Sequence, residues 1–367
     1  MWSALYAGSM FTPEKVTLHI HLTLDRQAEN VHLLSRLSQW KPDPAFRFEW
    51  TTGGYQLSLE VPRGLLLECR VSHGGFEEVG PDGLKRSPRV IAAGAEQTLQ
   101  FEVLGFKQDL MPEETRSGHI EEHQIHSPEL QDEVKLLIHL PSQYFMQPEA
   151  RFPVVYLHDG HNLFDRATSS FGFDWQADET AERFAAEGHP VILVGIWTRQ
   201  EKRMDYYIPF PSRFNGFRPQ GLNYLDFIVQ TLKPWVDGHF RVLQDRQHTA
   251  ICGSSLGGII SLYGAFQHPE VFGTAGIMSP ALWVGEYRAL DETNQSRADV
   301  RYFVDMGDRE GPTVESAANL VQLAKQLALQ LSQQGSEVEL LIGRDHLHHE
   351  SAWAERLPAF LQFFLKI

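Results

Sequence analysis

Two kinds of hydrophobic pattern divide the chain. From residue 14 to residue 107, short segments alternate apolar and polar residues, as in VTLHIHLTL (16–24) and GYQLSLEV (54–61). Turn-forming clusters such as KPDP (41–44) and GPDG (80–83) separate these segments. Short strands of period two with frequent turns predict a small antiparallel all-β sandwich of the immunoglobulin-like kind.

From Gly118 onward, continuous apolar runs alternate with segments of helical period. The runs that suit strands buried on both faces are VKLLIHL (134–140), FPVVYLHDG (152–160), PVILVGIW (190–197), TAICG (249–253), TAGIMS (274–279), VRYFVDMG (300–307) and EVELLIG (337–343). Helices are expected at 178–188, 222–240, 255–269 and 316–335. This alternation predicts a mostly parallel sheet covered by helices on both faces, in which ligands bind beyond the carboxyl ends of the strands.

The change of pattern predicts two domains. The polar stretch QDLMPEETRS (108–117) is interpreted as the linker between them. The β-domain is therefore expected to span 1–110 and the α/β domain 111–367.

Charge and cysteine content narrow the function classes. The 367 residues carry a formal net charge of −15, which argues against a nucleic-acid partner and against an anionic membrane surface. Two distant cysteines, Cys69 and Cys252, do not form a disulfide framework and favour a reducing compartment. The first residues contain no export signal and no apolar run is long enough to span a membrane, so we expect a cytoplasmic protein.

The sequence AICGSSLGGII (250–260) is the most informative short stretch. Gly253, Ser254, Ser255, Leu256 and Gly257 fit the pattern G-x-S-x-G, between an expected strand and an expected helix. In this context the central serine occupies a strained turn that exposes its hydroxyl, and glycines allow the close approach of strand and helix. The register selects Ser255 as a nucleophile and leaves Ser254 as a bystander, whereas the alternative is an ordinary Gly/Ser turn.

A nucleophilic serine needs a base and an acid, expected downstream in the order Ser, Asp/Glu, His. After the run 300–307, the candidates for the acid are Asp308 and Glu310. Asp305 is disfavoured because it lies inside the run. After the run 337–343, the sequence HLHHES offers His346, His348 and His349 as bases, and a plain polar loop is the favoured interpretation for His346.

The oxyanion hole is expected from two backbone N–H groups. One belongs to Leu256, which follows the nucleophile, and the other to His161 in the sequence HDGHN after the second apolar run. Gly160 is expected to give this loop its conformational freedom. An alternative is that the histidines of HDGH and HLHH bind a metal, although no HExxH helix or CxxC pair supports one. We therefore expect neither a metal nor a cofactor.

Aromatic residues after the strand ends, Trp175, Trp197 and Trp283, are candidates for either pocket lining or core. Four arginines, Arg199, Arg203, Arg213 and Arg218, are candidates for the wall of a cationic pocket or for solvated side chains. The sequence pattern leaves both choices open.

The chain from 118 to 367 resembles the putative esterase family of α/β-hydrolases, which includes enterochelin esterases and feruloyl-type esterases. The resemblance rests on VVYLHDGHNLFD, FDWQADETAERF, VILVGIW, the segment LKPWVDGHFRVLQDRQHTAICGSSLGGIISLYGAFQHPEVFG, SPALWVGE, DMGDREG and HHESAWAERLPAFLQFF. It implies an α/β-hydrolase fold with Ser255 as nucleophile, His348 as base and Glu310 as acid, with Asp308 second.

The same resemblance implies that Arg203 and Tyr206 lie beside the substrate, where we also expect Trp175 and Trp283. The match is looser around the insertion FPSRFNGFRPQG (210–221). The first hundred residues resemble a starch- or glycogen-binding β-sandwich. Of the two aromatic residues that such modules use, Trp40 is present, but Phe76 stands where a second tryptophan is expected. A structural or lid-forming role is therefore favoured over glucan capture.

These features predict a serine carboxylic-ester hydrolase that acts through an acyl-enzyme on small acyl, feruloyl-type or siderophore-lactone esters. The alternatives are a glucan-binding protein with an idle hydrolase domain, and a metal-dependent hydrolase. The expected partner is a small-molecule ester, and the N-terminal domain could also mediate a homo-oligomer.

Overall fold

A computed structural model of the protein describes residues 14–24, 28–80, 83, 85–107, 115–211, 217–285 and 287–367. Residues 108–114 of the expected linker and 212–216 of the insertion, with Arg213, lie outside the described residues. The contacts within the chain define two compact units. The N-terminal unit comprises 1–113 together with 309–319, and the C-terminal unit comprises 114–308 together with 320–367. The segment 309–319, expected in the second domain, thus groups with the N-terminal residues.

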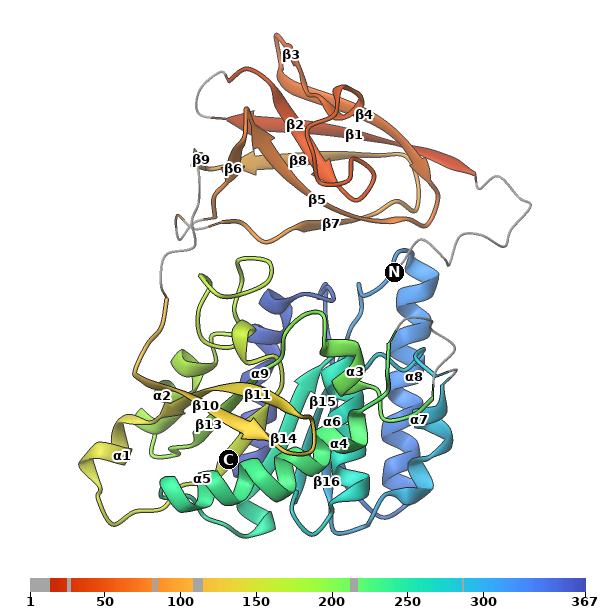
Figure 1. The fold of residues 1–367 in the computed structure, drawn as a ribbon. Helices are drawn as coiled ribbons and strands as arrows, with labels where there is room; N and C mark the ends of the chain where they lie inside the picture. Colours follow the sequence, from red (N-terminus) through yellow and green to blue (C-terminus); the bar gives the residue numbers. More distant parts are fainter. Residues whose placement is uncertain are drawn as a thin grey trace. The chain divides into compact units, whose positions relative to one another are not determined.

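The N-terminal unit consists of two β-sheets around one core (Figure 1). The first sheet has the order β3-β4-β1-β8 and the second the order β2-β5-β6-β9, with β7 paired to β5. In β1, Leu18, Ile20 and Leu22 are buried while the intervening residues face outward, so the period-two pattern is observed. The strands are β1 (Lys15–Leu24), β2 (Val31–Ser35), β3 (Glu49–Thr51), β4 (Gly54–Pro62), β5 (Leu66–His73), β6 (Phe76–Glu78), β7 (Arg89–Ala92), β8 (Gln97–Val103) and β9 (Phe106–Lys107).

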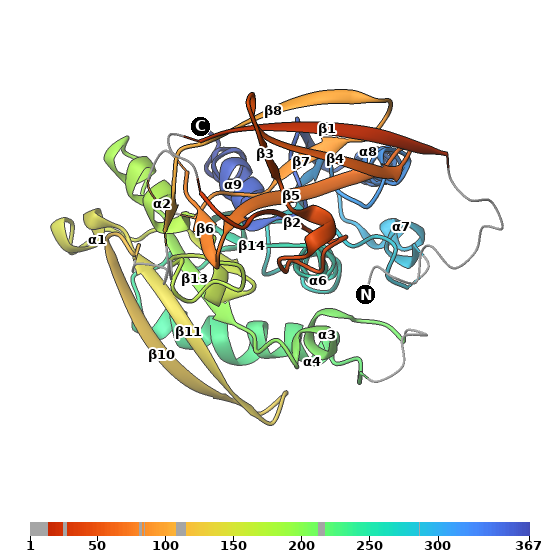
Figure 2. The same cartoon turned by 90° about the horizontal axis from the view of Figure 1, so that it is seen from above.

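The C-terminal unit contains an 8-stranded sheet of order β10-β11-β13-β12-β14-β15-β16-β17. The strands from β13 to β17 run parallel, whereas β10 and β11 form an antiparallel hairpin at one edge (Figure 2). Their bounds are β10 (His119–Ser127), β11 (Asp132–Leu140), β12 (Val154–Leu157), β13 (Ile192–Trp197), β14 (Thr249–Ser254), β15 (Thr274–Met278), β16 (Arg301–Gly307) and β17 (Glu337–Gly343). The α/β prediction is confirmed, and every apolar run named above contains a strand.

Helices cover both faces of this sheet (Figure 1). Alternate residues of β12 enter different cores: Val154 and Tyr156 pack with residues of α6 and α8, and Val155 and Leu157 pack with residues of α2 and α9. The helices are α1 (Ser142–Met146), α2 (Ala177–Ala186), α3 (Arg203–Tyr207), α4 (Gly221–Asp226), α5 (Lys233–His239), α6 (Leu256–Gln267), α7 (Arg288–Asp291), α8 (Val314–Gln333) and α9 (Glu350–Leu365). Among the described residues, no helix has both the length and the apolar character needed to cross a membrane.

Candidate active site

Ser255 occupies the turn between β14 and α6. Its backbone angles are φ 61° and ψ −119°, a conformation that is costly for a residue with a side chain and that persists only where the surroundings impose it. The Ser255 N–H donates to the Met278 carbonyl at 2.9 Å, and the Ser255 carbonyl accepts from the Ala281 N–H at 3.0 Å. The end of β15 and the turn that follows it therefore hold the strained residue in place.

The glycine before this turn is required by packing. A Cβ atom at Gly253 would lie 2.7 Å from Cδ2 of His158, whereas one at Gly257 would approach His158 only to an ordinary 3.4 Å. Gly253 therefore allows the loop after β12 to lie directly against the nucleophile turn. The sequence predicts that side chains at both glycines would collide with their surroundings, and the structure shows this collision at Gly253 but not at Gly257.

The loop after β12 carries the predicted oxyanion donor His161. Its left-handed residue is Asp159, with φ 55° and ψ 48°. Gly160 is needed for a different reason, because a Cβ there would lie 2.8 Å from the carbonyl carbon of Gly195 in β13. The expectation that Gly160 supplies conformational freedom is wrong, since the close approach to β13 is what excludes a side chain.

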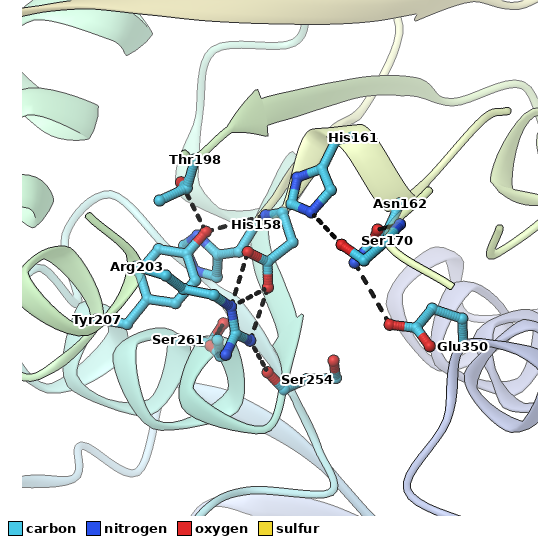
Figure 3. A network of polar contacts seen from close by, with 12 residues as sticks. His158, His161, Asn162, Ser170, Thr198, Arg203, Tyr207, Ser254, Ser261 and Glu350 are labelled. Atoms are coloured by element: carbon cyan, nitrogen blue, oxygen red, sulfur yellow. Dashed lines mark hydrogen bonds and ion pairs between the residues drawn. The ribbon is translucent and has the colours of Figure 1, made fainter. Parts of the chain in front are cut away.

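A buried ion pair joins this loop to α3 (Figure 3). Nε of Arg203 lies 3.0 Å from each oxygen of the Asp159 carboxylate, and Nη2 lies 2.8 Å from Oδ2. Nη2 also lies 3.4 Å from the carbonyl oxygen of Ser254, the residue before the nucleophile. Burial would raise the pKa of Asp159, but the guanidinium outweighs it and holds that pKa below its usual value. This pair therefore keeps both charges beside the nucleophile turn.

His158 lies beneath this pair as a neutral side chain. Its Nδ1 is 2.8 Å from the hydroxyl of Tyr224, and its ring lies 5.2 Å from that of Tyr207. Burial lowers the pKa of His158 to about 3, against the opposing influence of Asp159. The Tyr207 hydroxyl accepts from the Asp159 N–H at 3.0 Å and donates to Oγ1 of Thr198 at 2.8 Å. These contacts tie the Asp159 backbone to α3 and to the end of β13.

A second set of contacts joins the loop after β12 to the start of α9. Nδ2 of Asn162 lies 3.4 Å from Oε1 of Glu350, and Oδ1 of Asn162 accepts from the Ser170 N–H at 3.0 Å. Glu350 is only 4 % exposed, and burial raises the pKa of its carboxyl to about 7. Nε2 of His161 lies 3.0 Å from the hydroxyl of Ser170 (Figure 3). The sequence analysis predicted no role for Asn162 or Glu350, although Asn162 lies in the segment HDGHN and Glu350 in the segment HLHHES.

The three candidate histidines after β17 occupy different environments. His349 is the N-cap of α9, and its Nδ1 accepts from the Ser351 N–H at 3.2 Å. Nδ1 of His346 lies 3.1 Å from Nη1 of Arg356. The ring of His348 lies 5.0 Å from that of Trp353 and 6.3 Å from that of Trp283. Two of the three histidines thus have structural roles, and His348 is the one between two indoles.

The candidate acids also differ. Asp305 lies within β16, where its carboxylate accepts from Nε of Arg356 at 3.0 Å and from the Ser279 N–H at 2.8 Å. Oδ1 of Asp308 accepts from the Asp345 N–H at 2.7 Å, which joins the turns after β16 and β17. Glu310 is 1 % exposed and belongs to the segment 309–319. A structural role is therefore visible for Asp305 and for Asp308.

The residues expected beside the substrate are buried or half-buried. Trp175 is 2 % exposed and packs in the core, 5.8 Å from the ring of Trp353. Tyr206 donates from its hydroxyl to Asp132 at 2.7 Å. Trp283 is half-buried near His348. The structure therefore favours the core interpretation for Trp175, and the substrate contacts of the others remain predictions.

One acidic cluster contains none of the histidines that were considered as alternative metal ligands. Within the described ranges, ligand atoms of Asp174, Asp178 and Glu179 lie within 4.8 Å of one another, and no other group of three such residues meets this criterion. Burial raises the pKa of Asp174 to about 6 and that of Asp178 to about 9. Asp178 accepts from the Ser117 N–H at 2.6 Å, so the cluster helps to attach the start of β10 to α2.

Comparison with known proteins identifies the family. Residues 127–364 match the family model described as putative esterase. The uncharacterized protein YbbA of Bacillus subtilis is 26 % identical over 242 residues, which is 62 % of this chain and 91 % of the relative. The ferri-bacillibactin esterase BesA of the same organism is 25 % identical over 150 residues, covering 37 % of this chain and 50 % of BesA.

Among solved structures, the enterobactin esterase FES from Shigella flexneri has a TM-score of 0.60 at 13 % identity. The likeness covers 96 % of this chain and 93 % of that one, so the fold is shared over nearly the whole length. Since the family model spans more than half of the chain and the turn at Ser255 has the strand–turn–helix form of an α/β-hydrolase nucleophile, the chain belongs to the putative esterase family and is a carboxylesterase-type hydrolase.

Proposed function

We propose that the protein hydrolyses carboxylic esters through an acyl-enzyme on Ser255. The observation that carries this proposal is the strained backbone of Ser255, which is the N-cap residue of α6 and comes directly after a buried strand. Such a turn lifts a serine hydroxyl away from the sheet toward an incoming carbonyl. An ordinary strand–helix turn would place glycine at a position with this backbone conformation, so the presence of serine supports a chemical role for its hydroxyl.

His348 is proposed as the base and Glu310 as the acid that orients it. His348 would accept the Ser255 proton during attack and then protonate the leaving alcohol, after which water would hydrolyse the acyl-enzyme by the same route. The choice of His348 is supported by the structural roles of His346 and His349. The choice of Glu310 is supported by its burial and by the structural role of Asp308, which accepts a hydrogen bond from the turn after β17.

The N–H groups of Leu256 and His161 are proposed as the donors to the oxyanion. Leu256 is the first residue of α6, so its N–H has no acceptor within the helix and the positive end of the helix dipole lies beside it. His161 lies in the short 3-10 turn Gly160–Asn162, which the Arg203–Asp159 pair connects to the nucleophile turn. Two such donors contribute several kcal/mol to the stabilisation of the tetrahedral intermediate.

The substrate is proposed to be an ester whose acyl part carries an aromatic ring, as in feruloyl esters and in siderophore lactones of N-benzoylated amino acids. Support comes from relatives named as a feruloyl esterase of Xylanibacter ruminicola and as siderophore esterases, and from Trp283 near the proposed base. Turnover of methyl ferulate and a trilactone siderophore should be compared with that of methyl acetate, because methyl ferulate and methyl acetate share one leaving group and differ in the acyl part. A higher kcat/KM for methyl acetate than for methyl ferulate would contradict the aromatic class.

The N-terminal unit is proposed to be an immunoglobulin-like sandwich with a structural role rather than a glucan-binding module. The Trp40 ring lies 5.1 Å from the guanidinium of Arg70, and Phe76 stacks on His73 at 5.6 Å. Both rings thus have partners within the unit. Retention on immobilised starch or glycogen would contradict this proposal.

The mechanism is tested by Ser255→Ala, with Ser254→Ala as the matched control. Ser255→Ala should lower kcat for p-nitrophenyl acetate by about 10³-fold or more, and it should abolish labelling by an organophosphate. Ser254→Ala changes an adjacent buried serine and should retain activity within a few-fold. Wild-type turnover by Ser255→Ala, or activity that is sensitive to a chelator but insensitive to the organophosphate, would refute the serine mechanism.

A further inference from the structure

An exposed phenylalanine stands on a tight turn between β12 and α2. Phe171 is 61 % exposed. The Gly172 N–H donates to the Ser169 carbonyl at 3.2 Å, so residues 169–172 form a β-turn in which Phe171 is the third residue. Gly172 has a φ of 73°, a backbone conformation that glycine adopts without strain. The turn therefore has a defined geometry and presents the phenyl ring at its tip.

This turn is bonded to the loop that carries the proposed oxyanion donor. The Ser170 N–H donates to Oδ1 of Asn162 at 3.0 Å, and the Ser169 hydroxyl lies 3.3 Å from the same oxygen. The Ser170 hydroxyl lies 3.0 Å from Nε2 of His161 (Figure 3). Because consecutive Cα atoms are about 3.8 Å apart, these bonds hold the backbone of Phe171 beside the oxyanion loop.

The same turn contacts the segment that carries the proposed base. The ring of Phe171 lies 6.1 Å from the ring of His349, and the ring of Phe173 lies 4.9 Å from it. His349 is itself fixed as the N-cap of α9, and it directly follows His348 in the chain. Phe171 therefore stands next to both segments between which the ester carbonyl would be held.

Exposure by itself does not mark a site, because single exposed apolar side chains are common on protein surfaces. Phe145 in α1 is exposed to a similar degree, at 56 %. However, α1 follows the end of β11, where His139 pairs with Leu193 near the start of β13. Phe145 thus lies near the amino ends of the parallel strands, whereas ligands of such sheets bind beyond the carboxyl ends. The position of Phe171, rather than its exposure, points to a ligand.

We propose that Phe171 is a specificity-determining residue whose ring stacks on the aromatic ring of the acyl part of the ester. This inference rests on the proposed function, because it takes His161 and His348 as the residues beside the ester carbonyl. Two aromatic rings in contact gain free energy beyond the burial of apolar area. An acetyl group offers no ring and little area, so Phe171 should distinguish the two kinds of ester.

Phe171→Ala tests this proposal, with Phe145→Ala as the matched control. In Phe171→Ala, kcat/KM should fall about tenfold for methyl ferulate and less than about twofold for methyl acetate. Phe145→Ala should change neither value by more than about twofold. Phe171→Tyr retains an aromatic ring at the same position, so the preference for methyl ferulate should be kept within about threefold of the wild type.

The informative quantity is the ratio of the two kcat/KM values measured on one sample. A loss of folded enzyme lowers both values equally and leaves their ratio unchanged, so a purely structural role of Phe171 would not alter it. An unchanged ratio in Phe171→Ala, or an equal fall of the ratio in Phe145→Ala, would overturn the inference.

Failure of the proposed function is seen in other proteins of the same experiment. Full activity in Ser255→Ala would refute the serine mechanism, and a wild type that prefers methyl acetate would contradict the aromatic class of substrate. If only the inference about Phe171 fails, the wild type still prefers methyl ferulate and Phe171→Ala shows the same preference.

Discussion

Among the described residues of the C-terminal unit, two of the pairs that an arginine forms with a buried aspartate serve different ends. In the first, Asp159 stands in a loop with left-handed backbone, and Arg203 also contacts the Ser254 carbonyl. In the second, Asp305 lies inside β16, and Arg356 also donates to the Ser279 hydroxyl at 2.7 Å. The sheet fixes Asp305 whether or not it is paired, whereas the conformation of Asp159 depends on its partners.

This difference teaches that the same pairing of a buried aspartate with an arginine does not imply the same role. The pair of Asp305 and Arg356 attaches α9 to the sheet, so its removal should affect stability above all. The pair of Asp159 and Arg203 attaches a strained loop to the nucleophile turn, so its removal should also alter the geometry of the site. The predictions below test this distinction.

The largest effect is expected when one partner of either pair is removed. Arg203→Met and Arg356→Met would each leave a buried carboxylate without its cation, which should lower the free energy of unfolding by about 3–5 kcal/mol. Urea unfolding measures this loss. Arg203→Met should in addition lower kcat of the folded fraction at least about tenfold, while Arg356→Met should change it less than about threefold. The kcat of each variant is calculated per active site, with active sites counted by organophosphate titration. Equal losses of kcat in Arg203→Met and Arg356→Met would contradict the different roles of the two pairs.

A smaller effect is expected from His158, beneath the first pair. Its pKa is about 3 in the folded protein and about 6.5 when unfolded. A histidine with a lowered pKa must give up its proton to fold, so its contribution is fully present above pH 6.5 and is lost as the pH falls toward 3. Between these two pH values the free energy of unfolding falls by about 1.4 kcal/mol for each pH unit.

The measurement is the free energy of unfolding between pH 7.5 and pH 5 for the wild type and for His158→Asn, in which the amide replaces Nδ1 beside Tyr224. The wild type should lose about 2 kcal/mol more than the variant over this range. Parallel pH dependences for the two proteins would show that His158 is not held neutral by burial.

An effect of similar size but opposite sign is expected from Glu350. Its pKa is about 7 when folded and 4.5 in its unperturbed state, so the folded protein retains a proton that the unfolded chain releases. This contribution is present below pH 4.5 and is lost as the pH rises through 7. Glu350→Gln should therefore be more stable than the wild type at pH 8, by about 1–3 kcal/mol, and nearly equal to it at pH 4. A variant less stable than the wild type at pH 8 would indicate that the carboxylate is needed in its charged form.

The sequence was sufficient for features that depend on local pattern. Apolar runs predict the strands β11 to β17 because strands buried on both faces have no polar side to interrupt the run. The register of Ser255 could be assigned because a strand–turn–helix leaves only one position for an exposed hydroxyl. The expected helix at 222–240 is present, but it contains a π-helical turn at Phe227–Leu232 that periodicity did not reveal.

Features that depend on distant partners could not be predicted. The strand β10, HIEEHQIHS, is too polar to be recognised without its antiparallel neighbour β11. Asp159 and Arg203 are far apart in the sequence, and nothing local announces their ion pair. Trp175 was left between pocket and core because only packing decides where an indole lies. The grouping of 309–319 with the N-terminal unit likewise depends on contacts over a long stretch of chain.

That grouping has a consequence for biosynthesis. The strands of the N-terminal unit leave the ribosome early, but the segment that pairs with Leu65 and Leu66 emerges only after roughly 200 further residues. At about 5–20 residues per second, this interval is about 10–40 s. During that time the Leu66 N–H lacks its acceptor, the Pro312 carbonyl, and the Gly64 carbonyl lacks its donor, the Val314 N–H. The first unit to be synthesised is therefore completed only near the end of translation.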